Sequence, residues 1–422
     1  MAELHALRVD RAGTRAALER TWEAGAAALV LPQDASPEQV QRHLQRLRPS
    51  ALVERAARGG WDTVRLPDGV PVAAGVALVV VTSGSTGAAK GVELSHRALR
   101  ASVTASLTRL GARPGERWAL ALPTHHIAGI SVHLRAAALG TEAVVAADTA
   151  AVGHLDVEHV ALVPAQLDRL LDGGAAVERF STILLGGAPA ESQLLERARA
   201  RGARVVTSYG MTETVGGCVY DGLPLDGVEV AVDPGSARIR IRGPVLLEGY
   251  RTVPEDAPGG RASEAPARGP AGDGAAGATS GDDTPPVDAD GWFTTPDLGR
   301  LDFDGRLEVL GRADAVLISG GENVPLAAVE SLLRTHPAVA DVAVAAVTDT
   351  RWGQVPAALV VPAVADRPPD LGALRSHVRA QAPAAFAPGH LLLVDGLPRD
   401  GLGKLPRAEV AALLAARGLS PA

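Results

Sequence analysis

The sequence predicts an α/β protein with a large N-terminal α/β domain, a small β-rich subdomain within it, and a small C-terminal α+β domain. Apolar segments of strand length alternate with helical segments from residue 76 to residue 207, which is typical of a parallel sheet. Short alternating strands begin near Val228, and a compact set of helices and strands follows Asp314. We therefore expect domains at 1–313 and 314–422.

The composition indicates a soluble globular chain. Of its 422 residues, 46% are apolar and 21% are charged, with a formal net charge of −7. Lys and Arg are not clustered, which argues against a nucleic-acid partner. The single cysteine, Cys218, permits no internal disulfide and fits a reducing compartment. Without a signal peptide or a long apolar segment, we expect a cytoplasmic protein that does not bind membranes.

The first elements lead to a central strand. Residues 1–75 contain helical stretches at 11–24 and 37–47 and no candidate chemistry. The apolar run Val76 to Val81 predicts a buried strand of a parallel sheet, and Ser95 is suited to cap a helix over 96–110. Further strands are expected at 117–122, 143–147, 160–163, 182–185 and 204–207, with helices at 164–171 and 191–200.

In the second half of the chain, the sequence pattern changes near residue 228 and again at residue 254. Short strands are expected at 228–232 and 237–241. Pro254 to Asp290 is rich in Gly, Pro, Ala and Asp and has almost no large apolar residue, so we expect a disordered surface insertion. The C-terminal domain should contain helices at 326–334 and 371–381 and strands at 339–346, 357–361 and 390–393.

A loop of small residues follows the central strand. Glycine and hydroxyl residues let backbone N–H groups and hydroxyls close around a polyphosphate, and a nearby lysine adds positive charge. A flexible turn would not explain the hydroxyls or the lysine. Lys90 follows Ala89 and precedes Gly91, so the loop differs from G-x-x-x-x-G-K-[ST]. The candidate phosphate ligands are Thr82, Ser83, Gly84, Ser85, Thr86, Gly87 and Lys90.

The segment Ser208-Tyr-Gly-Met-Thr-Glu213 follows an expected strand, at the end where open α/β sheets bind ligands. Tyr209 offers a flat face for a purine, and Thr212 offers a hydroxyl for a phosphate. Glu213 offers an oxygen ligand for Mg²⁺. An ordinary β–α turn with a partly buried tyrosine is the structural alternative, and the hexapeptide alone leaves both open.

Other candidates are weaker when taken alone. The two histidines of Leu122-Pro-Thr-His-His-Ile-Ala-Gly129 do not have the spacing H-E-x-x-H and lack a nearby Cys or acid, so a metal site is disfavoured. One of them could equally be a core residue. The segment Leu185-Gly-Gly-Ala-Pro189 and Asp297 could be ordinary turns, and Lys404 could be a solvated charge.

Taken together, these motifs resemble those of the adenylate-forming superfamily of acyl-CoA synthetases, peptide-synthetase adenylation domains and luciferases. The similar motifs are T-S-G-S-T-G-x-x-K-G-V from Thr82, P-x-x-H-x-x-G around His126, Y-G-x-T-E from Tyr209, G-R-x-D…G-G-E-N from Gly311 and P-R-x-x-x-G-K-x-x-R from Pro398. They occur in the family's order between residues 82 and 407. Pro296 replaces the glycine of the usual T-G-D, and Asp400 replaces a frequent threonine.

The resemblance implies ATP, Mg²⁺ and CoA, with a small-molecule carboxylic acid as partner. It implies nucleotide contacts at Gly187, Ala188, Ser208, Tyr209, Gly210 and Met211, and ribose contacts at Asp297 and Arg312. Mg²⁺ would be held at Glu213 and Thr86, and catalysis would use Lys404, Thr212, Glu213 and His126. Asp314 would be the hinge, Gly320 and Gly321 would line a pantetheine tunnel, and the acid pocket would contain His126, Thr207 and Ser208.

The short N-terminal region and the segment from Thr207 to Thr214 resemble the o-succinylbenzoate–CoA ligases of menaquinone synthesis. Another aryl or short acyl acid is the alternative within this class. An enzyme that loads a carrier protein is a rival from another class. A catalytically silent nucleotide-binding protein is disfavoured by the presence of Lys404, Glu213 and Asp297. A homodimer is a further expectation.

Overall fold

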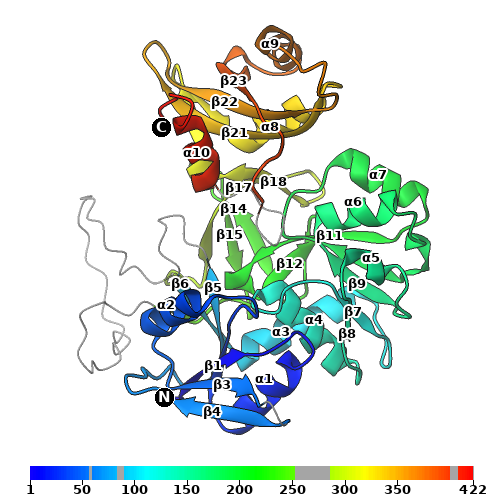
Figure 1. Ribbon diagram of the computed structural model, residues 1–422, viewed down its shortest axis with the longest axis vertical. Coiled ribbons are helices and arrows are strands. Elements are labelled where there is room, and N and C mark those ends of the chain that lie inside the picture. Colours follow the sequence, from blue (N-terminus) through cyan, green and yellow to red (C-terminus); the bar gives the residue numbers. More distant parts are fainter. Residues whose placement is uncertain (57–58, 83–89, 252–285, 400–406, 422) are drawn as a thin grey trace. The chain divides into compact units, whose positions relative to one another are not determined.

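A computed structural model describes residues 1–56, 59–82, 90–251, 286–399 and 407–421 (Figure 1). The chain forms two compact units, Met1–Val228 with Arg242–Phe293 and Glu229–Ile241 with Thr294–Ala422. The expected domain boundary at 313/314 stays a prediction. Lys404, the loop residues Ser83 to Gly87 and most of the expected insertion lie outside the described residues. Val287 pairs with Phe293, so regular pairing begins before the expected end of the insertion at Asp290.

The first sheet of unit 1 has a parallel centre and antiparallel edges, in the order β16-β6-β5-β2-β1-β3-β4. Strand β1 is parallel to β2 and β3, and β2 is parallel to β5. Strands β4, β6 and β16 add antiparallel edges. The strands are β1 (Leu4–Arg8), β2 (Ala27–Val30), β3 (Ala51–Arg55), β4 (Trp61–Arg65), β5 (Val76–Thr82), β6 (Lys90–Ser95) and β16 (Gly249–Arg251).

The second sheet of unit 1 has the order β13-β12-β11-β10-β9-β7-β8. Strands β7 to β11 are parallel, and β12 and β13 continue the sheet as antiparallel strands. The strands are β7 (Trp118–Leu120), β8 (Val144–Val145), β9 (His159–Leu162), β10 (Thr182–Leu185), β11 (Val205–Met211), β12 (Gly216–Tyr220) and β13 (Leu223–Pro224). All five strands predicted between residues 117 and 207 are present.

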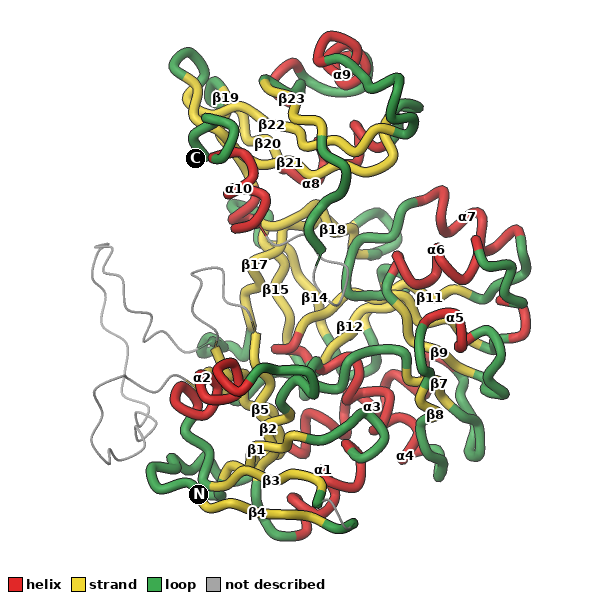
Figure 2. The backbone as a smooth tube through the Cα atoms, viewed as in Figure 1, coloured by secondary structure: helices red, strands yellow, loops and turns green. Residues whose placement is uncertain are grey.

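Helices form layers around and between these sheets (Figure 2). Helix α3 (His96–Leu110) contacts β5, β6 and β12, so it lies between the two sheets beside α4 (Ile127–Ala138). Helix α2 (Pro37–Leu47) shares a core with β1, β2 and β5, whereas α6 (Pro164–Asp172) and α7 (Ser192–Ala200) pack on the second sheet. The remaining helices are α1 (Thr14–Glu23) and α5 (Thr149–Val152).

Unit 2 contains most of a four-stranded sheet, β14 (Glu229–Val232), β15 (Arg238–Arg242), β17 (Phe293–Leu301) and β18 (Leu307–Arg312), and a five-stranded sheet. The latter contains β19 (Val316–Ser319), β20 (Glu322–Pro325), β21 (Val339–Asp349), β22 (Gly353–Pro362) and β23 (His390–Leu393). Alternate side chains of β21 and β22 point to opposite faces of this sheet, and each face has its own buried core. Helices α8 (Leu326–Arg334) and α9 (Leu371–Arg379) cover one face, and α10 (Arg407–Ala415) covers the other.

Sequence-based expectations missed several strands. Strands β1, β2, β3 and β4 lie in the N-terminal region, where only helices were expected. Strand β5 has an antiparallel partner, β6, which the sequence analysis treated as part of the loop before α3. Among the described residues, no helix has the length and apolar character that a membrane span requires.

Candidate active site

The motif that contains Tyr209 is the end of a strand and a tight hairpin, so the structural alternative of an ordinary β–α turn is not what the structure shows. Strand β11 is parallel to β10 up to Thr207 and antiparallel to β12 from Ser208 onward. A Cβ on Gly210 would lie 2.0 Å from the Gly216 carbonyl oxygen, so the two strands can approach this closely only at glycine. The motif therefore depends on glycines in both strands of the hairpin.

The turn that contains Glu213 is held by hydrogen bonds from its own residues and from helix α3. It is a 3₁₀ turn, Thr212–Thr214, and the Thr214 hydroxyl donates to the Gly216 carbonyl at 2.7 Å. The next residue, Val215, is fully buried with φ 55°, a conformation that β-branched residues rarely adopt. The Ser102 hydroxyl of α3 donates to its carbonyl oxygen at 3.3 Å. Surrounding packing therefore holds a strained backbone two residues after Glu213.

Ser208 and Thr207, both expected in the acid pocket, differ in their partners. The Thr207 hydroxyl donates to Asp221 at 2.9 Å, so its proton is already engaged. The Ser208 hydroxyl has no hydrogen-bond partner among the described residues. A Cβ on Gly217 would lie 2.0 Å from that hydroxyl oxygen, so glycine leaves room for it. Of the two hydroxyls, that of Ser208 is therefore the better candidate to donate a hydrogen bond to the acid.

The histidine motif forms the start of α4. His126 is the residue before the helix, and a Cβ on Gly129 would lie 2.2 Å from the Pro123 carbonyl oxygen. This contact explains why the motif needs glycine three residues after His126. The ring of His125 lies 4.2 Å from the His126 ring, and burial is the main cause that lowers the pKa of His125. Burial therefore favours the neutral imidazole of His125.

Tyr250 joins two of the expected site residues. Its hydroxyl donates to Glu213 Oε1 at 3.0 Å, and Lys90 Nζ lies 5.3 Å from the centre of its ring. Burial, followed by the charge of Glu213, raises the pKa of Tyr250, so the phenol stays protonated and remains a donor. No sequence signal indicated Tyr250, because it is distant in the chain and lies on a three-residue strand.

Arg135 is a second residue that the sequence analysis missed. Its side chain is 4% exposed and donates to the hydroxyls of Ser106 at 2.9 Å and Tyr220 at 3.4 Å. Its guanidinium lies over the Trp118 ring. Within the described part of the chain it forms no ion pair with a carboxylate. A charged residue within the apolar segment Ile127–Ala138 was the available signal.

In unit 2, the two expected ribose ligands are cross-strand neighbours, since Asp297 of β17 is directly opposite Arg312 of β18. The backbone N–H of Asp297 donates to the buried Thr295 hydroxyl at 3.1 Å. Asp314, the expected hinge, lies in a 3₁₀ turn directly after β18. The structure therefore places these three residues around a single strand end.

Gly320 and Gly321 form the two-residue turn between β19 and β20, with φ values of 58° and 90°. Both positive φ values suit glycine. A Cβ on Gly320 would lie 2.7 Å from the Trp352 ring, whereas one on Gly321 would meet no atom within 4 Å. Gly187 also has a positive φ, 82°, and lies with Ala188 after β10.

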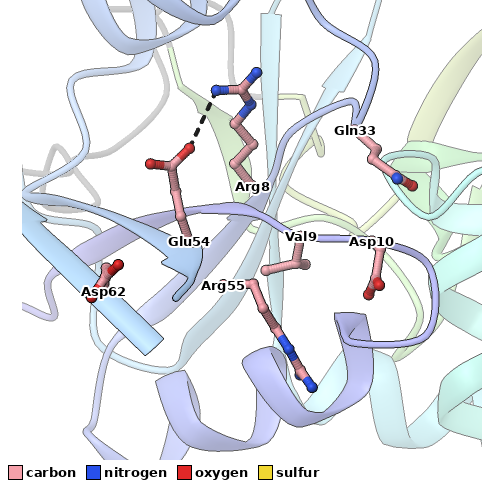
Figure 3. Close-up of a pocket in the computed structure, with 7 residues that line it drawn as sticks. All are labelled: Arg8, Val9, Asp10, Gln33, Glu54, Arg55 and Asp62. Carbon is pink, nitrogen blue, oxygen red and sulfur yellow. Dashed lines mark hydrogen bonds and ion pairs between the residues drawn. The ribbon is translucent and has the colours of Figure 1, made fainter. Parts of the chain in front are cut away.

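A polar pocket elsewhere in unit 1 contains none of the expected site residues (Figure 3). It has a volume of about 320 Å³, and in it Arg8 and Glu54 point toward one another with a 3.3 Å contact. Asp10 accepts from the Gly13 N–H at 2.6 Å. Arg8, Glu54 and Asp10 already have polar partners, and none of the expected site residues lines this pocket, so we do not assign the reaction to it. Its lining residues are Arg8, Val9, Asp10, Gln33, Glu54, Arg55 and Asp62.

Mg²⁺ fits the site around Glu213. Among the described residues, no group of three His, Cys, Asp or Glu side chains could hold a metal ion. Mg²⁺ usually binds one or two carboxylates and completes its coordination with phosphate oxygens and water. Tyr250 fixes one oxygen of Glu213, and the other carboxylate oxygen can bind a metal.

Comparison with known protein families assigns most of the chain to one family. The family described as "AMP-binding enzyme" matches residues 8–250, and "AMP-binding enzyme C-terminal domain" matches residues 328–404. The chain therefore belongs to the AMP-binding enzyme family, which confirms the resemblance.

Relatives within the family have a shared name. The probable 2-succinylbenzoate–CoA ligase of Mycobacterium tuberculosis H37Rv is 40% identical over 352 residues, 79% of this chain and 84% of that protein. The 2-succinylbenzoate–CoA ligase of Bacillus subtilis 168 is 31% identical over 361 residues, 79% of this chain and 68% of that protein.

Solved structures show the same fold. The B. subtilis o-succinylbenzoate CoA synthetase (MenE), in complex with the acyl-adenylate intermediate OSB-AMP, matches with a TM-score of 0.79 and 26% identity, covering 97% of this chain and 88% of that chain. ATP-bound MatB from Rhodopseudomonas palustris matches with a TM-score of 0.80 and 21% identity, covering 98% and 89%, which is a likeness of fold alone. The expected α/β architecture with a large N-terminal and a small C-terminal domain is confirmed.

Proposed function

We propose that this protein is an ATP-dependent 2-succinylbenzoate–CoA ligase of menaquinone synthesis. Its cosubstrates are ATP and CoA, and its cofactor is Mg²⁺. The observation that carries the proposal is the likeness over 97% of the chain to a solved o-succinylbenzoate CoA synthetase bound to OSB-AMP. The relatives with 40% and 31% identity bear the corresponding name.

The first half-reaction makes the acid reactive. The carboxylate oxygen attacks the α-phosphorus of ATP, the bond to the β-phosphate oxygen breaks, and pyrophosphate leaves. Lys404 and Lys90 would offset the negative charge that develops on the phosphates, and Thr86 and Thr212 would donate hydrogen bonds. Mg²⁺, when bound at Glu213, supplies further charge stabilisation. Asp297 and Arg312 would hold the ribose.

The second half-reaction uses the same site after the C-terminal domain turns about Asp314. The CoA thiol loses its proton and attacks the acyl carbonyl carbon, the bond to the adenylate oxygen breaks, and AMP leaves. Gly320 and Gly321 would line the entry of the pantetheine arm. A carrier-protein acceptor would use the same first half-reaction and remains the alternative.

Recognition of the acid would involve His126 and Ser208. The acid carries two carboxylates, one activated and one retained. The buried Arg135 guanidinium has no carboxylate partner among the described residues, and its positive potential favours an acid with a second negative charge. Thr207 has its proton engaged by Asp221 and contributes less. Homodimer assembly and a cytoplasmic location stay predictions.

A panel of acids tests the substrate. We expect 2-succinylbenzoate to exceed benzoate, phenylbutyrate-type acids and fatty acids by at least about tenfold in kcat/KM, measured as AMP release with CoA, because unpaired donors in a closed site disfavour the other acids. Glu213→Gln is the control that should lower all rates together. A higher kcat/KM for benzoate or a fatty acid would contradict the substrate while leaving the AMP-forming ligase class intact.

A further inference from the structure

The two sheets of unit 1 meet at the strand that contains Tyr250. The backbone N–H of Leu247, just before β16, donates to the Glu213 carbonyl oxygen at 2.9 Å. Strand β16 itself pairs with β6, and Tyr250 is opposite Val92. The short β16 strand therefore connects the strand that begins at Lys90 with the turn that contains Glu213.

Strand β16 is held firmly by Arg251. This side chain is 7% exposed, and its Nε donates to the Leu47 carbonyl oxygen at 2.7 Å. It also donates to carbonyl oxygens of Arg48, Val70 and Pro71 and forms an ion pair with Glu93 of β6 at 3.4 Å. A buried guanidinium with this many acceptors leaves β16 little freedom. Tyr250 therefore projects from a fixed backbone.

The phenol contacts two groups of opposite charge. Its hydroxyl donates to Glu213 Oε1 at 3.0 Å, while the Lys90 ammonium lies over its ring at 5.3 Å. Lys90 forms no ion pair with any carboxylate of the described residues. One aromatic ring thus separates the ammonium from the carboxylate and leaves both charges available to a ligand.

We propose that Tyr250 is a positioning residue that orients Glu213 for Mg²⁺ through its hydroxyl and holds Lys90 for the nucleotide phosphates through its ring. The inference rests on the proposed function, because it concerns the same nucleotide site. Residues that orient a metal ligand typically change metal affinity 10- to 100-fold when they are substituted. The ring contact is weaker, because the Tyr250 ring is only partly buried and a cation over a solvent-accessible ring contributes little.

Tyr250→Phe and Tyr250→Leu separate these two roles. The phenylalanine variant loses the hydroxyl and keeps the ring, and the leucine variant loses both. Tyr220→Phe is the control, because Tyr220 is a buried tyrosine of the same unit whose hydroxyl bonds to Ser106 at 2.8 Å. Glu213→Gln serves as the reference for loss of the metal ligand.

The measurement is ATP affinity by isothermal titration calorimetry without acid or CoA, once with Mg²⁺ and once with EDTA, after thermal melting has shown that each variant is folded. The ratio of the ATP affinity with Mg²⁺ to the ATP affinity with EDTA should fall about tenfold in Tyr250→Phe. The ATP affinity of this variant in EDTA should stay within about twofold of wild type. Tyr250→Leu should also lose about two- to fivefold in EDTA. Tyr220→Phe should keep the wild-type ratio.

An unchanged ratio in Tyr250→Phe, with a collapsed ratio in Glu213→Gln, would overturn the role of Tyr250 and leave the proposed function standing. If the wild type itself bound ATP equally well with Mg²⁺ and EDTA, and Glu213→Gln changed nothing, both proposals would fall. A smaller loss in Tyr250→Leu than in Tyr250→Phe would contradict the ring contact.

Discussion

The turn that contains Glu213 and the turn of Gly320 and Gly321 differ in how tightly the chain holds them. Around Glu213, the side chains of Ser102, Thr214 and Tyr250 bond to the turn or to the residues beside it. Gly320 and Gly321 are exposed, and the Gly320 N–H donates to the Trp352 carbonyl oxygen at 2.9 Å.

This difference suits the two half-reactions. Stabilising charge on phosphates works best when the groups are fixed before the reaction, because their reorientation costs no free energy at that moment. A loop that contacts a thiol substrate in one step need only have the correct backbone conformation. We therefore expect substitutions near Glu213 to affect adenylation and substitutions at Gly320 to affect thioester formation.

The largest effect should come from Lys404→Ala. In the proposed reaction Lys404 offsets charge at the α-phosphate, so its loss should slow adenylation by about 10²–10³-fold, as for loss of one donor to a developing oxyanion. Thioester formation from pre-made acyl-adenylate should change little. Single-turnover measurements of each half-reaction check this, and equal losses in both would contradict the division between the two steps.

Arg251→Met should destabilise the anchored region strongly. Removing one partner of a buried ion pair leaves Glu93 uncompensated and should lower the free energy of unfolding by about 3–5 kcal/mol. Burial raises the pKa of Glu93 and Arg251 lowers it, so the variant should have a still higher Glu93 pKa. Above that pKa, the unpaired Glu93 carboxylate is charged and destabilises the folded variant. Protonation of Glu93 at low pH removes this loss of stability.

Urea unfolding at pH 5 and pH 8 checks this sign. The loss of stability in Arg251→Met should be smaller at pH 5, and adding Glu93→Gln to the variant should recover stability at pH 8. An equal loss at both pH values would show that carbonyl acceptors, rather than Glu93, dominate.

Gly320→Ala should separate the turn from the nucleotide site. The added Cβ meets the Trp352 ring at 2.7 Å and requires φ 58°, so about 1–2 kcal/mol of stability should be lost. Thioester formation should slow more than adenylation. Gly321→Ala is the matched control, because it has a positive φ but no neighbour within 4 Å. If both variants slowed adenylation equally, the turn would not be specific to the second step.

Thr207→Val should have the smallest effect on activity. Removing a hydroxyl that donates to Asp221 should lower stability by about 1 kcal/mol. Its kcat/KM for 2-succinylbenzoate should stay within about twofold, whereas Ser208→Ala should lose more, because that hydroxyl has no partner in the part of the chain that the structure describes. A larger loss in Thr207→Val than in Ser208→Ala would restore Thr207 as an acid-binding residue.

Local signals predicted much of the fold. Helix α2 begins at Pro37 because Ser36 and Gln39 form a capping box, and α3 begins at His96 because the Ser95 hydroxyl accepts from the Ala98 N–H. Such contacts span only three residues, so the sequence shows them directly.

The missed features depend on contacts between distant residues. Tyr250 meets Glu213 only because β16 pairs with β6, and no local pattern indicates that pairing. The strand over Lys90–Ser95 pairs with its neighbour β5 in a hairpin, and it was missed because the segment was treated as part of the loop before α3. The buried environment of Arg135 arises from α3 and β12 together. Motif order supplied the candidate site residues, which stay predictions, and it gave no information on the contacts that orient them.

The central claim is that an acyl-adenylate forms before CoA reacts, in a preorganised nucleotide site. ATP–pyrophosphate exchange in the presence of 2-succinylbenzoate and Mg²⁺, without CoA, tests it most directly. We predict exchange that depends on the acid, is lost in Glu213→Gln, and is followed by AMP release only when CoA is added. Exchange that required CoA, or release of ADP and phosphate in place of AMP and pyrophosphate, would contradict the account.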